Sequence, residues 1–268
     1  MVYKKSLKSK NLKIVILGHE GQLGTELFKS LSLKYKTFGI SKNYSTKSDN
    51  YLGNLYFTKK LIISLNDISP DIIINCAAFT KVQECETKKN YAKRVNGNSL
   101  KRISEYCLNN NIFLIHFSTD YVFSGAKNTE YKETDLPKPI NEYGKSKLLG
   151  EKHIIKSGCN FIILRISWVF SFYKSNFVKK ILYLSKSKKE LKIICDQFGK
   201  PTSTYLVSKA IEKIISNELK NKFKIKEIYH LSCKGKTNWF NFAKEIINLY
   251  SNKENLNFIL KKAYSTKK

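Results

Sequence analysis

The first part of the chain alternates short apolar runs with longer amphipathic segments. The apolar runs are rich in isoleucine and apolar throughout, as expected for strands buried on both faces of a parallel sheet. They occupy Lys13–Leu17, Lys36–Ile40, Asp71–Asn75, Ile112–Phe117 and Phe161–Ile166. The segments between them have helical periodicity, at Gly24–Leu33, Thr58–Leu65, Tyr91–Asn109 and Tyr143–Lys156. This alternation predicts an α/β fold with a doubly wound parallel sheet and right-handed crossovers.

The regular alternation of apolar strands and amphipathic helices ends at about residue 167. Helices are predicted at Asn176–Ser187, Ser203–Asn217 and Trp239–Leu249, and strands at Leu191–Cys195 and Glu227–Leu231. We therefore expect residues 12–167 to form a first domain. Residues 168–268 are expected to form mainly a smaller lobe, interleaved with that domain.

The formal charge of +28 raises the question of nucleic-acid binding. Only three of the 49 basic residues are arginines, the side chain that binds phosphates and bases bidentately. The lysines are spread along the whole chain and form no single basic stripe. We therefore expect no nucleic-acid partner, and a basic surface that attracts small anionic ligands.

Other classes are disfavoured by what the sequence lacks. No apolar run approaches the roughly 20 residues of a membrane-spanning helix, and no signal-peptide pattern follows the charged N-terminus. The six cysteines are far apart and include no Cys-x-x-Cys pair, which argues against a zinc site and a disulfide framework. We expect a cytoplasmic protein with reduced thiols, no membrane contact and no bound metal.

Three glycines follow the first predicted strand in the pattern Gly-x-x-Gly-x-x-Gly. Gly18, Gly21 and Gly24 stand in the string GHEGQLG, and a predicted helix begins there. Glycine permits a tight turn and a close approach of the backbone to a pyrophosphate, which then binds at the positive end of the helix. The position between strand and helix therefore predicts a dinucleotide-binding loop.

The end of the second predicted strand bears on the choice between NAD and NADP. A carboxylate at this place binds the 2′-hydroxyl of NAD and repels the 2′-phosphate of NADP. This chain has Ser41 and Lys42 there, a hydroxyl and a cation. We therefore expect NADPH as the cofactor, with NADH as the alternative.

A tyrosine and a lysine four residues apart are the main catalytic candidates. Tyr143 and Lys147 share one face of a predicted helix, and the fourth predicted strand ends in Ser118 and Thr119. A free tyrosine, with a pKa of ~10, is a poor acid at neutral pH. A nearby ammonium group is expected to lower that pKa and to make proton transfer to a carbonyl oxygen practical. A hydroxyl from Thr119 or Ser118 can hold the same oxygen.

These motifs and several longer strings resemble those of the extended short-chain dehydrogenase/reductases. The strings are GHEGQLG, PDIIINCAAFTKVQECE, FSTDYVFSG, YGKSKLLGE, RISWVF, ICDQFGKPT and YHLSCKGKTNWFNFAKEI. Over about residues 12–250 their order is similar to that of the dTDP-4-dehydrorhamnose reductase family. The resemblance implies a Rossmann domain at residues 12–167 and a substrate-binding lobe within residues 168–268. It also implies NADPH-dependent reduction of the C4 keto group of a nucleotide-linked 6-deoxy sugar, above all dTDP-4-dehydro-L-rhamnose.

The resemblance also assigns roles to individual residues. Thr119, Tyr143 and Lys147 are implied to be the catalytic triad, in which Tyr143 protonates the oxygen at C4 and Lys147 holds the nicotinamide ribose. The implied cofactor contacts are Gly18, Gly21, Gln22, Leu23, Ser41, Asn54, Leu55, Ala78, Phe79, Thr80, Phe117, Tyr143 and Lys147. The implied substrate contacts are Thr119, Asp120 and Trp168.

Alternatives to this interpretation stay open at the level of sequence. Relatives of the family include non-catalytic, NADP-binding regulatory subunits. Sugar-nucleotide 4-epimerases and dehydratases belong to the same superfamily, but they retain NAD and usually carry an acid after the second strand. Family chains usually continue beyond the place of Lys268, so we expect a short C-terminal end of the substrate lobe. Some members form a magnesium-bridged dimer at the position of Glu26; we expect no metal here, and a homodimer stays open.

Overall fold

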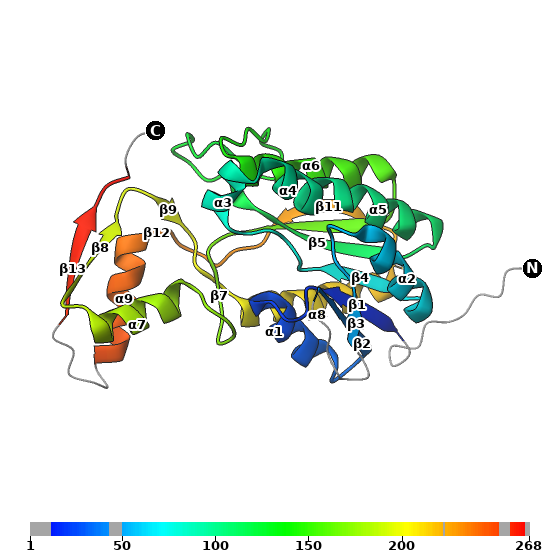
Figure 1. Ribbon diagram of the computed structural model, residues 1–268, viewed down its shortest axis with the longest axis horizontal. Coiled ribbons are helices and arrows are strands. Elements are labelled where there is room, and N and C mark those ends of the chain that lie inside the picture. Colours follow the sequence, from blue (N-terminus) through cyan, green and yellow to red (C-terminus); the bar gives the residue numbers. More distant parts are fainter. Residues whose placement is uncertain (1–11, 43–49, 222, 252–257, 266–268) are drawn as a thin grey trace, which may run out of the picture.

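The computed structural model describes residues 12–42, 50–221, 223–251 and 258–265, and a seven-stranded sheet forms its centre (Figure 1). The strand order is β11-β6-β5-β4-β1-β2-β3, and every neighbouring pair is parallel. The strands are β1 (Lys13–Leu17), β2 (Lys36–Ser41), β3 (Asn50–Leu52), β4 (Ile72–Asn75), β5 (Phe113–Thr119), β6 (Phe161–Ile166) and β11 (Lys226–His230). The predicted doubly wound parallel sheet of the Rossmann type is confirmed.

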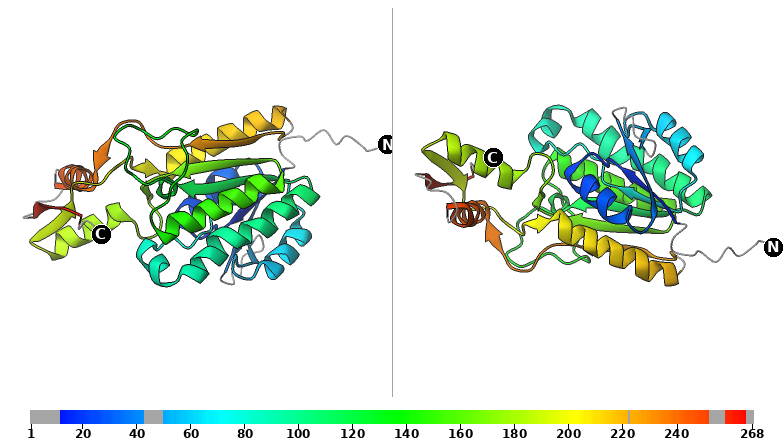
Figure 2. Two further views of the ribbon diagram at one scale, coloured as in Figure 1. Left: turned by 90° about the horizontal axis from the view of Figure 1, so that it is seen from above. Right: turned by 90° about the horizontal axis from the view of Figure 1, so that it is seen from below.

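Helices cover both faces of this sheet (Figure 2). One face packs against α1 (Gln22–Leu31) and α8 (Thr204–Lys220), and the other against α2 (Thr58–Ile68), α5 (Ser99–Asn109) and α6 (Glu142–Ser157). Successive side chains of a strand point to opposite faces, so Ile14 and Ile16 of β1 face α1 and α8, whereas Val15 and Leu17 face the other three helices. No helix in the described ranges is long and apolar enough to cross a membrane.

The helix predicted over Tyr91–Asn109 forms without a gap, but it is not α-helical throughout. It consists of α4 (Lys89–Ala92), a π-helical turn (Lys93–Asn98) and α5, and the short α3 (Val82–Thr87) precedes it. Within the π turn, buried Asn96 accepts a hydrogen bond from the backbone amide of Phe79 at 2.7 Å and donates one to its carbonyl at 3.0 Å. This tertiary pairing explains the irregular turn, which helical periodicity alone does not predict.

A smaller lobe lies beside the sheet, at the left of Figure 1. Its core is formed by α7 (Phe177–Ser187), α9 (Trp239–Ser251) and the parallel pair β8 (Glu190–Ile194) and β13 (Ile259–Ala263). Two short pairs lie between lobe and sheet, β7 (Val169–Phe170) with β10 (Thr202–Ser203) and β9 (Phe198–Gly199) with β12 (Thr237–Asn238). In contrast, α8 and β11 belong to the large sheet and its helical layer. The second part of the chain therefore supplies both units.

Candidate active site

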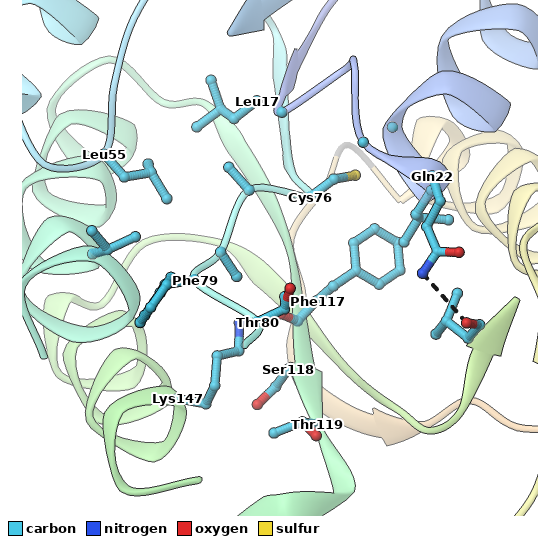
Figure 3. A pocket seen from close by; sticks show the side chains of 18 of the residues that line it. Leu17, Gln22, Leu55, Cys76, Phe79, Thr80, Phe117, Ser118, Thr119 and Lys147 are labelled. Carbon is cyan, nitrogen blue, oxygen red and sulfur yellow. Dashed lines mark hydrogen bonds between the residues drawn. The ribbon is translucent and has the colours of Figure 1, made fainter. Parts of the chain in front are cut away.

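A cavity of about 710 Å³ opens at the carboxyl ends of the parallel strands (Figure 3). It includes the ends of β1 and β4, where the strand order reverses, which is the usual ligand site of a doubly wound sheet. Every site residue predicted from the sequence lines it: Gly18, Gly21, Gln22, Leu23, Ser41, Asn54, Leu55, Ala78, Phe79, Thr80, Phe117, Thr119, Asp120, Tyr143, Lys147 and Trp168. The fold therefore brings these widely separated residues to a single cavity.

The glycine loop forms one end of this cavity. Gly18 has a positive φ of 76°, and a Cβ on Gly24 would lie 2.2 Å from the carbonyl oxygen of Gly18. Only glycine therefore lets α1 begin so close to β1. Gly21 caps α1 without a side-chain hydrogen bond, so the first amides of this ten-residue helix are open to an anionic group.

Gln22 has a second contact besides its place in the loop. Its side-chain amide donates a hydrogen bond to the carbonyl oxygen of Val169 at 3.3 Å, drawn as a dashed line in Figure 3. Because Val169 lies in β7, this bond joins the glycine loop to the segment that leads into the smaller lobe.

The end of β2 forms the next part of the wall. Buried Ser41 and exposed Lys42 both line the cavity, together with Asn54, whose side-chain oxygen accepts a hydrogen bond from the amide of Tyr56 at 2.8 Å. No carboxylate is found at Ser41, Lys42 or Asn54, so this part of the wall lacks the acid that selects NAD.

The opposite end of the cavity holds Thr119 and Tyr143. Thr119 is the last residue of β5, and Tyr143 lies in the first turn of α6, which Asn141 caps by accepting a hydrogen bond from the amide of Gly144 at 2.7 Å. A Cβ on Gly144 would lie 2.1 Å from the carbonyl oxygen of Tyr121, so glycine is required for α6 to approach the segment after β5. This close approach sets Tyr143 beside Thr119 in the wall of the cavity.

Burial raises the pKa of Tyr143, and the carboxylate of Asp120 raises it further, while the hydrogen bond with Thr119 opposes both effects. The expected lowering of this pKa by Lys147 is therefore wrong for the structure as it stands. The Lys147 ammonium is instead held by β5, where it donates to the carbonyl oxygen of Phe117 at 2.6 Å and lies 3.2 Å from Nε2 of His116. Burial lowers the pKa of Lys147 to about 8, against the opposing effect of Glu151.

Asp120 is the second titratable group at this end. Thr119 Oγ donates a hydrogen bond to its Oδ1 at 3.0 Å. Burial raises the pKa of Asp120 to about 6, although that hydrogen bond and two backbone amides act in the opposite direction. Asp120 thus titrates close to neutrality, within a chain of polar groups that runs from Asp120 through Thr119 to Tyr143.

A buried ion pair behind the site was not anticipated from the sequence. Arg165 of β6 binds Glu151 of α6 through two bonds, Nη2 to Oε2 at 2.7 Å and Nε to Oε1 at 3.1 Å, and Ser118 of β5 donates to the same carboxylate. Together with Ser118, the pair joins β6 to β5 and α6, the two elements that present the catalytic candidates. Its sequence signal is an arginine inside an apolar strand and a glutamate four residues after Lys147 on the same helix face.

Trp168 lines the cavity, and a second tryptophan, Trp239, stacks on its ring. The rings of Trp168 and Trp239 are stacked, with centroids 3.5 Å apart and an interplanar angle of 10°. The sequence predicted Trp239 only as the start of a helix. Among the described residues, no group of three or more His, Cys, Asp or Glu side chains is arranged to hold a metal ion.

Comparison with known proteins identifies similar chains. A family model described as the RmlD substrate binding domain matches residues 12–268. The dTDP-4-dehydrorhamnose reductase of Escherichia coli K12 is 34% identical over 232 residues, which cover 87% of this chain and 76% of that protein. The enzyme of the same name from Shigella flexneri is 34% identical over 263 residues, 95% of this chain and 86% of that one.

Solved structures give the same picture. The NADP complex of dTDP-4-dehydrorhamnose reductase from Bacillus anthracis superposes with a TM-score of 0.84 at 30% identity, covering 95% of this chain and 85% of that one. The NAD⁺ complex of WbmH from Bordetella bronchiseptica reaches a TM-score of 0.78 at 15% identity, over 94% of this chain and 85% of that one. The second likeness concerns the fold alone.

Proposed function

The chain belongs to the RmlD substrate binding domain family, and from this premise we propose that it is an NADPH-dependent oxidoreductase that reduces the C4 keto group of dTDP-4-dehydro-L-rhamnose to give dTDP-L-rhamnose. One observation carries the proposal. Thr119, Tyr143 and Lys147 converge on the wall of a cavity whose other end is a glycine loop. A proton donor and a nucleotide cradle in one cavity are what reduction of a carbonyl by a nicotinamide requires.

The residues present fit a dinucleotide. The uncapped amides that follow Gly21 suit a pyrophosphate, and Lys42 beside Ser41 suits a 2′-phosphate. In the proposed arrangement, Gly18, Gln22 and Leu23 complete the pyrophosphate site. Asn54 and Leu55 lie by the adenosine, and the path to the nicotinamide is lined by Ala78, Phe79, Thr80 and Phe117.

When bound, the nicotinamide of NADPH supplies the hydride for C4. The protein supplies the proton, which passes from the Tyr143 hydroxyl to the oxygen at C4 as charge develops there. Tyr143 is in the protonated form at neutral pH, which is the form that can donate. Thr119 donates a hydrogen bond to the same oxygen, and the buried Lys147 side chain holds the nicotinamide ribose. Asp120 and Trp168 contact the sugar nucleotide.

A non-catalytic, NADP-binding regulatory subunit is the second candidate. A binding subunit has no need of a tyrosine beside Thr119 in the cavity wall or of a buried lysine one helical turn further along α6. Both are present here, and they favour the reductase. The likeness to structures in complex with NAD, among them MoeE5 with UDP-glucose and a dTDP-glucose 4,6-dehydratase, lies at 15–17% identity and concerns the fold, so it does not favour an epimerase or dehydratase.

The proposal extends to the setting of the reaction. The substrate is a small nucleotide sugar rather than a nucleic acid, and residues 12–167 mainly hold the cofactor while residues 168–268 mainly hold the sugar nucleotide.

All six cysteines are free thiols, which suits a cytoplasmic location. Exposed Tyr205 and Leu206 on the first turn of α8 suit a homodimer contact, which sedimentation equilibrium would test.

The test is the oxidation of NADPH, followed by absorbance, with dTDP-4-dehydro-L-rhamnose as substrate. Wild type is expected to turn over, with NADPH preferred to NADH. Tyr143→Phe is expected to lower kcat by about 10²–10⁴, the contribution of a positioned acid, while still binding NADPH. NADPH binding without turnover in the wild type contradicts the reductase and supports the regulatory subunit.

A further inference from the structure

Trp168 and Trp239 are the only two tryptophans of the chain, and both line the cavity. Trp168 follows β6 of the large sheet, whereas Trp239 is the first residue of α9 in the smaller lobe. Their nearly parallel rings, with centroids 3.5 Å apart, leave no room for another ring or a sugar between them. Phe177 of α7 packs against Trp239 at a centroid distance of 4.5 Å. One face of Trp168 is therefore closed by an aromatic cluster of the lobe.

Gly199 closes the other face of Trp168. A Cβ on Gly199 would lie 2.3 Å from Cε2, 2.6 Å from Cζ2 and 2.7 Å from Nε1 of the indole. Cε2 is bonded to both Cζ2 and Nε1, and it is the nearest of the three atoms. A Cβ approaching in the ring plane would lie closer to Cζ2 and Nε1 than to Cε2, so the Cβ position lies above the face of the ring. Trp239 is already stacked on one side at 3.5 Å, so Gly199 lies on the opposite side. No side chain larger than hydrogen fits at residue 199 without moving the indole.

Backbone hydrogen bonds hold Gly199 and Trp168 in these positions. Gly199 in β9 pairs with Thr237 in β12, two residues before Trp239. The amide of Thr202 donates a hydrogen bond to the carbonyl oxygen of Trp168 at 3.2 Å. Trp168 itself has a φ of 46°, a left-handed conformation that bulky residues rarely adopt. The surrounding contacts thus fix the indole in an orientation that its own backbone does not favour.

We infer that Trp239 and Gly199 are positioning residues that set the specificity for the sugar nucleotide by turning the edge of Trp168 into the cavity. Both faces of the indole are covered, so Trp168 does not stack on the substrate. Its Nε1–H makes no hydrogen bond among the described residues, and this donor binds an oxygen of the nucleotide-linked sugar. The inference rests on the proposed function, because that function supplies the substrate.

Steady-state kinetics with each substrate varied in turn test the inference. Trp239→Leu is expected to raise the KM for dTDP-4-dehydro-L-rhamnose about tenfold, with a smaller change in kcat and less than about a twofold change in the KM for NADPH. Gly199→Ala is expected to have the same signature, because its methyl group displaces the indole. Trp239→Phe, which keeps an aromatic ring against Trp168, is expected to restore most of the affinity. Trp168→Phe keeps the stack, lacks the N–H donor and is expected to raise the same KM.

Phe242→Leu is the matched control. Phe242 lies on α9 as well and stacks on Phe177, but it does not line the cavity. It is expected to lower the free energy of unfolding without changing the ratio of the two KM values. Circular dichroism detects the stack directly, because two coupled indoles give a characteristic signal. Wild type is expected to show this signal, and Trp239→Leu and Trp168→Phe are expected to lack it.

Three results would overturn the inference. They are an unchanged sugar-nucleotide KM in folded Trp239→Leu, equal increases in both KM values, or an unchanged KM in Trp168→Phe. Quenching of tryptophan emission by dTDP-L-rhamnose separates this inference from the proposed reaction. Binding that weakens in Trp239→Leu supports the inference even without turnover, whereas the absence of binding to wild type contradicts both.

Discussion

Replacing Asp120 by asparagine is expected to stabilise the fold at neutral pH while impairing the site. Asp120 accepts a hydrogen bond from Thr119 Oγ at 3.0 Å, and an asparagine side-chain oxygen can accept the same bond. The variant removes the negative charge of the Asp120 carboxylate, which burial disfavours. Burial raises the pKa of Asp120 from 3.8 to about 6, so the folded protein holds the proton more tightly than the unfolded chain does.

The size of the effect follows from that shift. A shift of roughly two pKa units corresponds to about 3 kcal/mol at neutral pH. Because Asp120 is partly exposed, solvent screening reduces the expected gain in the free energy of unfolding to about 1–2 kcal/mol. The sign depends on pH. Below pH 3.8 the Asp120 carboxyl is neutral in both the folded and the unfolded state. Between pH 3.8 and about 6 the wild type loses stability as the pH rises, because the unfolded chain ionises first. Above about pH 6 the difference in the free energy of unfolding between the variant and the wild type is constant.

Urea unfolding of wild type and Asp120→Asn at several pH values between about 4 and 8 measures this difference directly. The variant is expected to match the wild type near pH 4 and to exceed it by about 1–2 kcal/mol near pH 8, with a raised KM for the sugar nucleotide. Thr119→Ser, which keeps the hydroxyl and the charge, is the control and is expected to keep the pH dependence of wild type. A difference that is the same at all pH values, or a variant less stable near pH 8, would refute the reasoning.

Three further outcomes follow from the structure. Gly24→Ala places a methyl group 2.2 Å from the carbonyl oxygen of Gly18, so NADPH affinity in a fluorescence titration is expected to fall at least about tenfold; unchanged affinity would contradict the tight loop. Glu151→Gln leaves the buried Arg165 cation without its counter-charge and is expected to cost about 3–5 kcal/mol in denaturant unfolding, whereas a loss below about 1 kcal/mol would mean that the pair contributes little. Burial lowers the pKa of Lys147 to about 8, so kcat/KM is expected to fall as pH rises through that value because the cation is lost, and Lys147→Met is expected to lack this decline.

Much of the cavity was predictable because its motifs are local. A glycine loop between a strand and a helix, or a tyrosine and a lysine on one helix face, requires only the spacing of neighbouring residues and the geometry of the element that carries them. The parallel sheet was predictable for the same reason, since its strands are apolar throughout and alternate with amphipathic helices. Carboxyl ends of parallel strands meet at one edge, so the order of elements already placed Gly18 and Thr119 on the same side.

Contacts between distant segments were decided only by the tertiary structure. Arg165 and Glu151, like Trp168 and Trp239, have no sequence pattern that pairs them, because each pairing depends on how two elements pack. The short strands β7, β9, β10 and β12 carry too few residues to show a period, and they form because neighbouring segments offer them partners. The direction of the Tyr143 pKa shift is the clearest case. Spacing placed a lysine within reach, but the depth of burial and the nearby Asp120 carboxylate, which only the folded chain determines, decide the sign.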